Sequence, residues 1–210
     1  MKKTFFALPD NIRDHNFYGF DWLESLTAIP SPLALVTTYK NNGKTNASMQ
    51  AWLTFSSDYG FYCIFSSVHK GTHMYKTIHD TGALVINFMS ADIYRKCYST
   101  IEHNGYDDDE ISAAGLTSLT ADKVNAPIVE ECFLNIECEY VWEKEYTPDS
   151  DHVVMCVKVI NVHMDEEYYK AGARGRYGKI GYLYNIHSPV DPDSGIFEKT
   201  CLGIINKLDV

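Results

Sequence analysis

A tight turn between two β-branched segments is the feature that most limits the fold of this chain. Residues 32–39 are largely apolar and β-branched, which predicts a strand. Asn41, Asn42 and Gly43 follow, and these residue types tolerate the positive φ angles of a hairpin turn. A return strand is expected over 45–55. The chain therefore begins its core with an antiparallel pair, which favours a mainly β architecture over a doubly wound α/β fold.

Other segments extend this pattern. Further strands are expected over 60–66, 83–89, part of 128–142, and 153–162, where Val153, Met155, Val157 and Val159 alternate with more polar neighbours. Short helices are expected over 73–79, with Thr72 as N-cap, and over 92–103, followed by a solvated acidic loop at 104–109. No repeat or linker divides the chain. The sequence predicts one mainly β domain over 1–210, a barrel or sandwich with short helices inserted.

Charge and composition exclude several classes of partner. The net charge of −10 argues against nucleic acid and against anionic membrane surfaces. No apolar run reaches the roughly 18 residues that a membrane helix needs, and the apolar stretch near the start is too short for a signal peptide. Six cysteines occur without a CxxC pair, which is typical of reduced, buried thiols. These features predict a cytoplasmic protein.

Most sequence motifs of catalysis are absent. Gly43, Lys44 and Thr45 resemble the end of a P-loop, but Thr38 stands where its first glycine should be. The glycines of 172–178 lack dinucleotide-binding spacing. His69 and His73 are four residues apart, but Gly71 and the expected helix start lie between them. We therefore expect no metal site.

The segment 66–72 is the best candidate for anion binding. It offers two serines, His69, Lys70, a flexible Gly71 and the start of a helix. Backbone amides at a helix N-terminus favour an anion, and Lys70 adds a positive charge. The segment fits a phosphate cradle, and it also fits a polar surface loop that precedes a capped helix.

Taken together, these motifs resemble the flavin reductase-like family, which includes the flavoredoxins. The resemblance covers roughly residues 29–177, in family order. It is carried by 32–38, 43–48, Ala51 and Trp52, 66–72, 81–87, 126–132, 136–138, and Asp151 with His152. It implies an FMN-binding split β-barrel, antiparallel and Greek-key-like, with a core over about 29–177 and a C-terminal extension over about 178–210.

The resemblance also implies a set of cofactor contacts. Residues of 46–54 would flank the flavin ring, and residues of 66–72 would bind the phosphate of the cofactor. The residues alone favour a core aromatic for Trp52. The residues that the resemblance assigns to the cofactor are Asn46, Ala47, Ser48, Trp52, Leu53, Thr54, Ser66, Ser67, His69, Lys70, Thr72 and Arg174.

One residue is assigned to the chemistry. Asp151 and His152 resemble a Gly-Asp-His element near the nicotinamide side of the flavin, with Ser150 in place of the glycine. His152 is the candidate catalytic residue; the alternative is a histidine that only forms hydrogen bonds at a strand start. Arg174 would pair with a phosphate of FMN or of the nicotinamide nucleotide, or be solvated.

The resemblance predicts an oxidoreductase that passes electrons from NADH or NADPH through FMN to a flavin or another acceptor, such as an electron-acceptor protein. It also predicts a homodimer, with 153–162 and the aromatic-rich C-terminal stretch as candidate contacts. Two alternatives remain open: a flavoredoxin-type FMN carrier that a partner protein reduces, and an enzyme of the related pyridoxamine phosphate oxidase-like barrels. The basic substrate cluster expected of the last is not evident.

Overall fold

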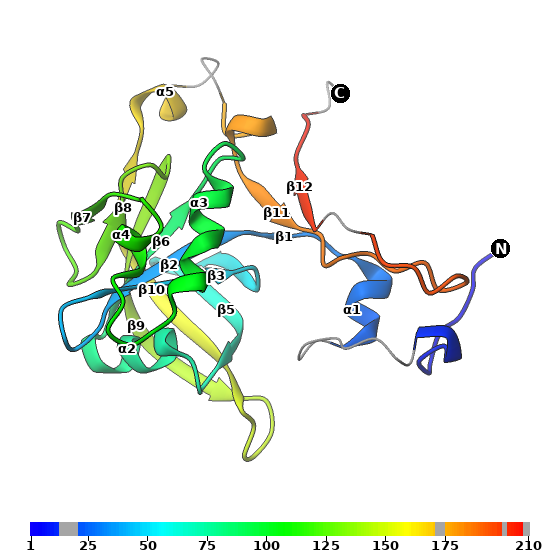
Figure 1. Ribbon diagram of the computed structural model, residues 1–210. Helices are drawn as coiled ribbons and strands as arrows, with labels where there is room; N and C mark the ends of the chain where they lie inside the picture. The colour runs from blue at the N-terminus through cyan, green and yellow to red at the C-terminus, as the bar shows by residue number, and fades with distance from the viewer. Residues whose placement is uncertain (13–20, 171–174, 199–200, 208–210) are drawn as a thin grey trace. The chain divides into compact units, whose positions relative to one another are not determined.

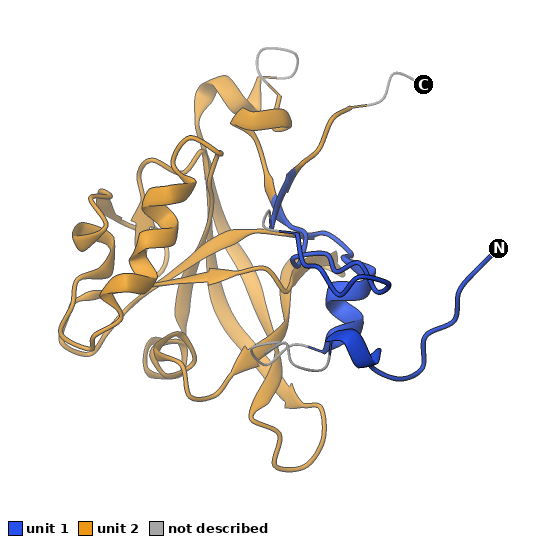
Figure 2. Ribbon diagram, turned by 45° about the vertical axis from the view of Figure 1, so that its right-hand side comes forward, with its two compact units in different colours: residues 1–31, 184–203 blue, residues 32–183, 204–210 orange. Residues whose placement is uncertain are grey.

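The computed structural model describes residues 1–12, 21–170, 175–198 and 201–207. These residues form two compact units (Figure 2). The larger unit contains residues 32–183 and 204–210, and the smaller unit contains residues 1–31 and 184–203. The predicted cofactor and catalytic residues that the structure describes all belong to the larger unit.

A seven-stranded sheet is the framework of the larger unit (Figure 1). The strand order is β3-β2-β6-β9-β10-β5-β4, and each neighbouring pair is antiparallel. This confirms the mainly β, antiparallel prediction. The strands are β2 (Ala34–Tyr39), β3 (Thr45–Gln50), β4 (Leu53–Ser57), β5 (Phe61–His69), β6 (Ala83–Phe88), β9 (Leu134–Glu145) and β10 (His152–Met164).

The predicted hairpin is present between β2 and β3. Tyr39 pairs with Thr45, and the Lys40 N–H donates to the Lys44 carbonyl at 2.8 Å. Gly43 has φ of +78°, a conformation that costs glycine little and other residues more. The turn residues therefore set the register of the pair, as the sequence predicts.

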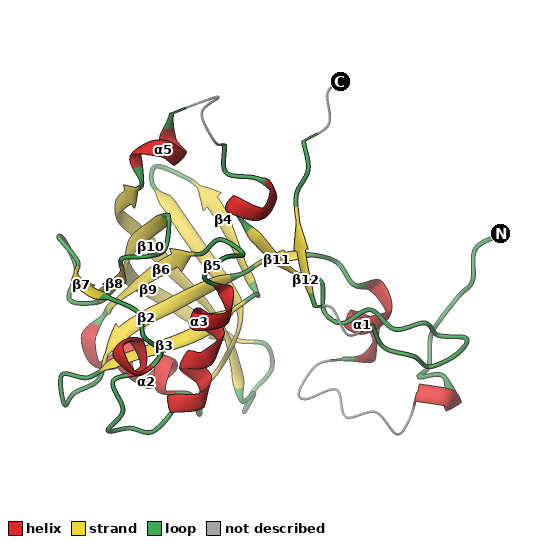
Figure 3. Ribbon diagram, turned by 45° about the horizontal axis from the view of Figure 1, so that its top comes forward, coloured by secondary structure: helices red, strands yellow, loops and turns green. Residues whose placement is uncertain are grey.

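The prediction of a single strand over 45–55 is wrong. The structure divides it into β3 and β4, which occupy opposite edges of the sheet. Only Ala51 and Trp52 separate Gln50 from Leu53, a link that spans at most about 11 Å. A flat sheet of this size would hold its edges about 29 Å apart. The sheet must therefore curl until its edges approach each other, which produces the barrel seen in Figure 3.

The inside of this curved sheet holds the main core. Side chains from all its strands except β3 meet there, and α2 (His73–Thr81) adds Met74 and Ile78. The helix begins after Thr72, the predicted N-cap, and ends at Gly82 with φ of +69°. The fully buried members include Val36, Phe65, Leu84, Met155 and Val157.

Residues 92–103 are less regular than expected. They form α3 (Tyr94–Ser99) and a 3-10 turn, η2 (Thr100–His103), in place of one helix. The sequence did not predict α4 (Glu110–Ala113), β7 (Ser118–Thr120), β8 (Pro127–Val129), α5 (Glu166–Tyr169) or η3 (Gly178–Ile180). β7 and β8 form a separate pair, and Ile128 packs with Val85 and Ala126 in a second apolar cluster.

The smaller unit contains η1 (Asp10–Ile12) and α1 (Trp22–Thr27), capped by the Asp21 carboxylate. Glu24 on α1 contacts His187 Nδ1 at 2.5 Å. Burial, assisted by the charge of Asp21, raises the pKa of Glu24 to about 7.

Three short strands form a further sheet in the order β1-β11-β12: β1 (Ser31–Pro32), β11 (Leu183–Asn185) and β12 (Leu202–Ile204).

The six cysteines are all free thiols. Within the described residues, no helix has the length and apolar character required to span a bilayer.

Candidate functional site

A bulge near the end of β5 redirects the two predicted serines. Phe65 pairs with Met155 and Val68 with Val153, so β5 fits one more residue than β10 into the same interval. The Ser66 N–H donates at 2.8 Å to the carbonyl of Trp52, the residue just before β4. Bulges locally turn side chains away from regular alternation. Ser66 and Ser67 are accordingly both half-buried where the strand leads into α2.

The turn from β5 to α2 is organised around His69. Its carbonyl accepts the Thr72 hydroxyl at 2.8 Å, and its Nδ1 accepts the Gly71 N–H at 3.0 Å. A Cβ on Gly71 would lie 2.7 Å from His69 Cε1, so a larger residue would displace the ring. Thr72 Oγ1 accepts the Tyr75 N–H at 3.2 Å. This cap leaves the first amides of α2 available to an anion, because they have no intrahelical partner.

Lys70 is less available than the sequence suggests. Its ammonium group forms an ion pair with Glu145 on β9, and this pair lowers the pKa of Glu145. Lys70 is also fixed through its backbone, since its N–H donates to the Asp151 carbonyl at 2.9 Å. An anion at this turn would compete with Glu145 for the Lys70 charge.

His152 lies next to this turn. It pairs with His69 across β10 and β5, and the two rings meet edge to face with centroids 4.9 Å apart. The structure therefore brings the predicted catalytic histidine to the predicted phosphate cradle.

Asn46 and Ala47 of β3 face different surroundings. The Ala47 N–H donates to Glu110 Oε2 at 2.8 Å, so this amide already has a partner within the chain. Asn46 is 2% exposed, and its Nδ2 has no hydrogen-bond partner within the chain. Ser48, on the same face as Asn46, is half-buried and accepts Gln50 Nε2 at 3.0 Å. Of the three, Asn46 has the clearest unused donor.

Three predicted contacts lie on or beside β4. Leu53 is buried in the main core, whereas Thr54 is exposed. Successive strand residues point to opposite faces, so these two cannot contact the same side of one ligand. Trp52 is half-buried beside Ser66. Arg174 lies outside the described residues.

A buried ion pair that the sequence did not predict supports β3. Glu110, which the sequence does not distinguish from the acidic loop before it, is 1% exposed and lies 2.8 Å from Lys40 Nζ through Oε1. Burial raises the pKa of Glu110, and the contacts with Lys40 and the Ala47 N–H oppose that rise. Asp109, expected in a solvated loop, accepts the Thr45 hydroxyl at 2.6 Å. The acidic run resembles solvated loops elsewhere, and nothing in its pattern indicates this burial.

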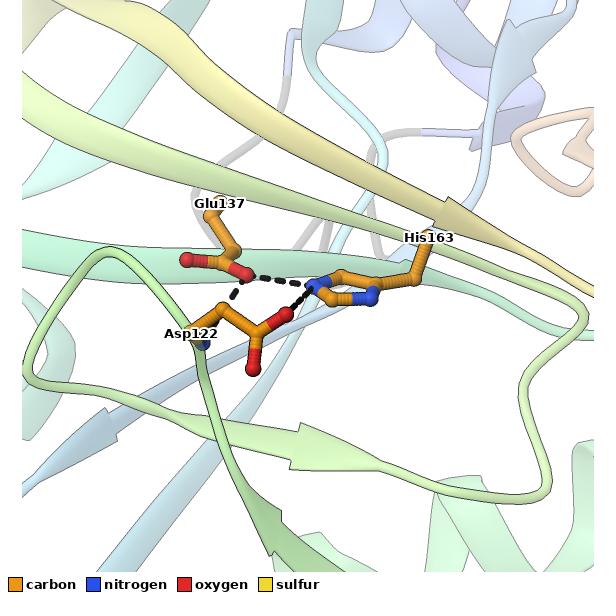
Figure 4. A group of neighbouring side chains, drawn as sticks. All are labelled: Asp122, Glu137 and His163. Carbon is orange, nitrogen blue, oxygen red and sulfur yellow. Dashed lines mark hydrogen bonds and ion pairs between the residues drawn. The ribbon is translucent and has the colours of Figure 1, made fainter.

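A second polar cluster consists of Asp122, Glu137 and His163 (Figure 4). The Glu137 carboxylate on β9 is fully buried and contacts His163 Nε2. It also accepts Asn161 Nδ2 at 2.9 Å and the amides of Asp122 and Lys123 at 3.1 and 2.7 Å. Asp122, Glu137 and His163 offer ligand atoms within 4.8 Å of one another. The hydrogen bonds already satisfy Glu137, which anchors the preceding loop to the sheet.

Comparison with known families accounts for this fold. The model of the flavin reductase-like domain matches residues 26–181. The chain belongs to the flavin reductase-like family. This flavin reductase-like chain resembles flavoredoxin of Desulfovibrio vulgaris, with a TM-score of 0.70 and 20% identity over 100% of this chain and 96% of that one.

Two other solved structures share the fold. Nitrilotriacetate monooxygenase component B from Bacillus cereus has a TM-score of 0.75 and 15% identity over 100% of both chains. An FMN-binding protein from Thermus thermophilus has a TM-score of 0.63 and 15% identity over 88% of this chain and 90% of that one. At these identities the likeness establishes the split-barrel fold.

Two relatives in sequence are uncharacterized proteins. An uncharacterized protein of Methanothermobacter thermautotrophicus is 26% identical over 144 residues, 67% of this chain and 66% of that one. An uncharacterized protein of Aquifex aeolicus is 26% identical over 168 residues, 74% of this chain and 84% of that one.

The residues present fit a phosphorylated flavin. Such a cofactor needs hydrogen-bond donors for its oxygens and a less polar wall for its ring. The chain offers the amides at the start of α2, the half-buried hydroxyls of Ser66 and Ser67, and the unused donor of Asn46. A buried donor without a partner costs free energy, which a cofactor oxygen would recover.

Proposed function

We propose that this flavin reductase-like chain binds FMN between the β5–α2 turn and β3, and that it passes electrons from NADH or NADPH to a flavin or another acceptor. The observation that carries the proposal is the β5–α2 turn. There a strand bulge, a capped helix and an unsatisfied asparagine donor occur in one part of the larger unit.

Several of the predicted residues have a stated role in this proposal. The α2 amides, Thr72 and the two serines hold the phosphate, and Lys70 contributes charge when it leaves Glu145. Bound FMN supplies the hydride and electron chemistry. His152 orients the nicotinamide or exchanges a proton, and Arg174 pairs with a phosphate. The chain acts as a homodimer in the cytoplasm, and its six free thiols support a reducing compartment.

A flavoredoxin-type carrier is the second candidate. The position of His152 favours it, because the residue assigned to the nicotinamide side lies against His69 at the cradle. In this alternative, a partner protein reduces the bound FMN and no nicotinamide site exists.

One spectroscopic experiment tests both candidates. The purified protein is reconstituted with FMN, and its visible spectrum is recorded without oxygen before and after NADH, then NADPH. Bleaching of bound flavin by either nucleotide supports the reductase, and the faster nucleotide identifies the donor. Flavin that stays oxidised until dithionite is added supports the carrier. A protein that retains no FMN would contradict both.

A further inference from the structure

Two polar atoms are left unsatisfied where α2 meets β3. Within the part of the chain that the structure describes, four buried side-chain atoms have no hydrogen-bond partner. One is Asn46 Nδ2 on β3 and another is His73 Nδ1 on the first residue of α2. Each unsatisfied buried donor costs about 1–3 kcal/mol, so their occurrence in one region of the fold needs a physical reason.

The strand register shows that Asn46 faces α2. Asn46 pairs directly with Thr38 on β2, and directly paired residues point to the same face of a sheet. Thr38 Oγ1 lies 2.6 Å from Thr77 Oγ1 on α2. The Thr77 hydroxyl also donates to the His73 carbonyl, one turn earlier, at 2.8 Å. The Asn46 side chain is therefore directed toward the helix that begins with His73.

The surroundings of His73 offer no better partner for these atoms. Its ring packs edge to face on Tyr106, with centroids 6.0 Å apart. Glu110 Oε1 is another of the four atoms, and it forms an ion pair with Lys40 Nζ at 2.8 Å, while Glu110 Oε2 accepts the Ala47 N–H. Within the described residues, neither Asn46 Nδ2 nor His73 Nδ1 has a hydrogen-bond partner, and a ligand oxygen is a group that both can bind.

We propose that Asn46 and His73 together bind an oxygen of the phosphorylated side chain of the flavin, which makes His73 a cofactor-binding residue. This rests on the proposed function and moves Asn46 from the ring, where the family resemblance puts it, to the phosphate-bearing chain. His73 is placed for this role because it is the first residue of the same helix whose N-terminal amides form the proposed phosphate cradle. The oxygen belongs either to the phosphate or to a neighbouring ribityl hydroxyl.

Binding and stability measured on the apo-protein test this proposal. The variants are Asn46→Leu and His73→Leu, with His79→Leu near the end of the same helix as the matched control. Dissociation constants for FMN and riboflavin are measured by quenching of flavin fluorescence, and unfolding midpoints are measured without flavin. We expect a roughly tenfold weaker FMN affinity for each site variant. The FMN affinity of His79→Leu should be unchanged. We also expect no loss of midpoint for Asn46→Leu, because it removes an unsatisfied donor.

Riboflavin identifies the oxygen. Unchanged riboflavin affinity in the site variants assigns the contact to the phosphate, and an equal loss for both flavins assigns it to a ribityl hydroxyl. If either leucine variant fails to fold, Asn46→Asp and His73→Asn keep the side-chain size. Asn46→Asp should then weaken FMN binding, since it replaces a donor by a negative charge. His73→Asn should keep most of the FMN affinity.

The outcomes separate this inference from the proposed function. Wild-type protein that binds no FMN overturns both. Wild-type protein that binds FMN, with site variants whose FMN dissociation constants stay within a factor of two, overturns the inference alone. In that case an internal water satisfies the two atoms.

Discussion

Lys40 carries its ammonium group into the interior, where it meets Glu110 at 2.8 Å and the carbonyls of Gly105 and Asp108 at 2.9 Å. Removing one partner of such a pair leaves a buried charge without compensation. The pair connects the loop before α4 to β3, because Glu110 also holds the Ala47 amide. It is therefore a support of the strand that carries Asn46.

We predict that Lys40→Met lowers the free energy of unfolding by about 3–5 kcal/mol. Adding Glu110→Gln should recover part of this loss, because the neutral amide still accepts the Ala47 N–H without an unpaired charge. Urea unfolding of the two single variants and the double variant measures the coupling. Additive losses would show that the two side chains do not stabilise each other.

Glu137 is a second buried charge, and its contribution to stability depends on pH. Burial tends to raise its pKa, but hydrogen bonds from His163, Asn161 and two amides lower it to about 2. The stabilisation is therefore fully present above the ordinary value of 4.5 and is lost as pH falls through about 2. We predict that Glu137→Gln costs about 2–3 kcal/mol at pH 7 and much less near pH 2. Urea unfolding at pH 7, 4 and 2.5 checks this, and an equal cost at each pH would contradict it.

At the scale of elements, local signals were sufficient where neighbours in sequence are neighbours in space. Asn41 to Gly43 predict the β2–β3 turn, Thr72 predicts the start of α2, and the alternation from Val153 predicts β10. The division between β3 and β4 escaped prediction because Gln50, Ala51 and Trp52 include no glycine or proline. The bulge at Ser66 depends on pairing with β10, which no local pattern encodes.

The cap of α2 has its own test. Thr72→Ala removes the acceptor for the Tyr75 N–H, so we expect a loss of about 1 kcal/mol in the free energy of unfolding. Thr72→Ser keeps a hydroxyl at this position and should lose much less. Denaturant unfolding of the flavin-free protein compares the two. Equal losses would mean that the threonine methyl group, rather than the cap, is what matters.

At the scale of the whole molecule, the family and the fold class followed from an ordered series of weak motifs. The site residues stay predictions. The sequence proposed residues along 46–72, but it did not show that Lys70 faces Glu145, that His152 faces His69, or that Glu110 is buried. Each of these contacts joins segments that are distant in sequence, and it exists only after the sheet has formed.

The exposed apolar residues of β10 carry the prediction of a homodimer. Ile160 and Val162 are 38% and 48% exposed. A second copy would cover them. We expect a dimer mass at micromolar concentration by light scattering, and a monomer after Ile160→Lys with Val162→Lys. Tyr98→Lys on α3, where Tyr98 is 48% exposed, is the control and should remain dimeric. A monomeric wild-type protein would contradict the prediction.

The two-residue link between β3 and β4 also determines how the chain must fold. Consecutive strands end on opposite edges, so neither can use the other as a template. The hairpins β2–β3, β4–β5 and β9–β10 can form from local contacts, but β5 meets β10 only when Phe65 finds Met155 far along the chain. Contacts of such long sequence separation slow folding. Until they form, the unpaired edges are open to other chains, and aggregation competes with closure of the barrel.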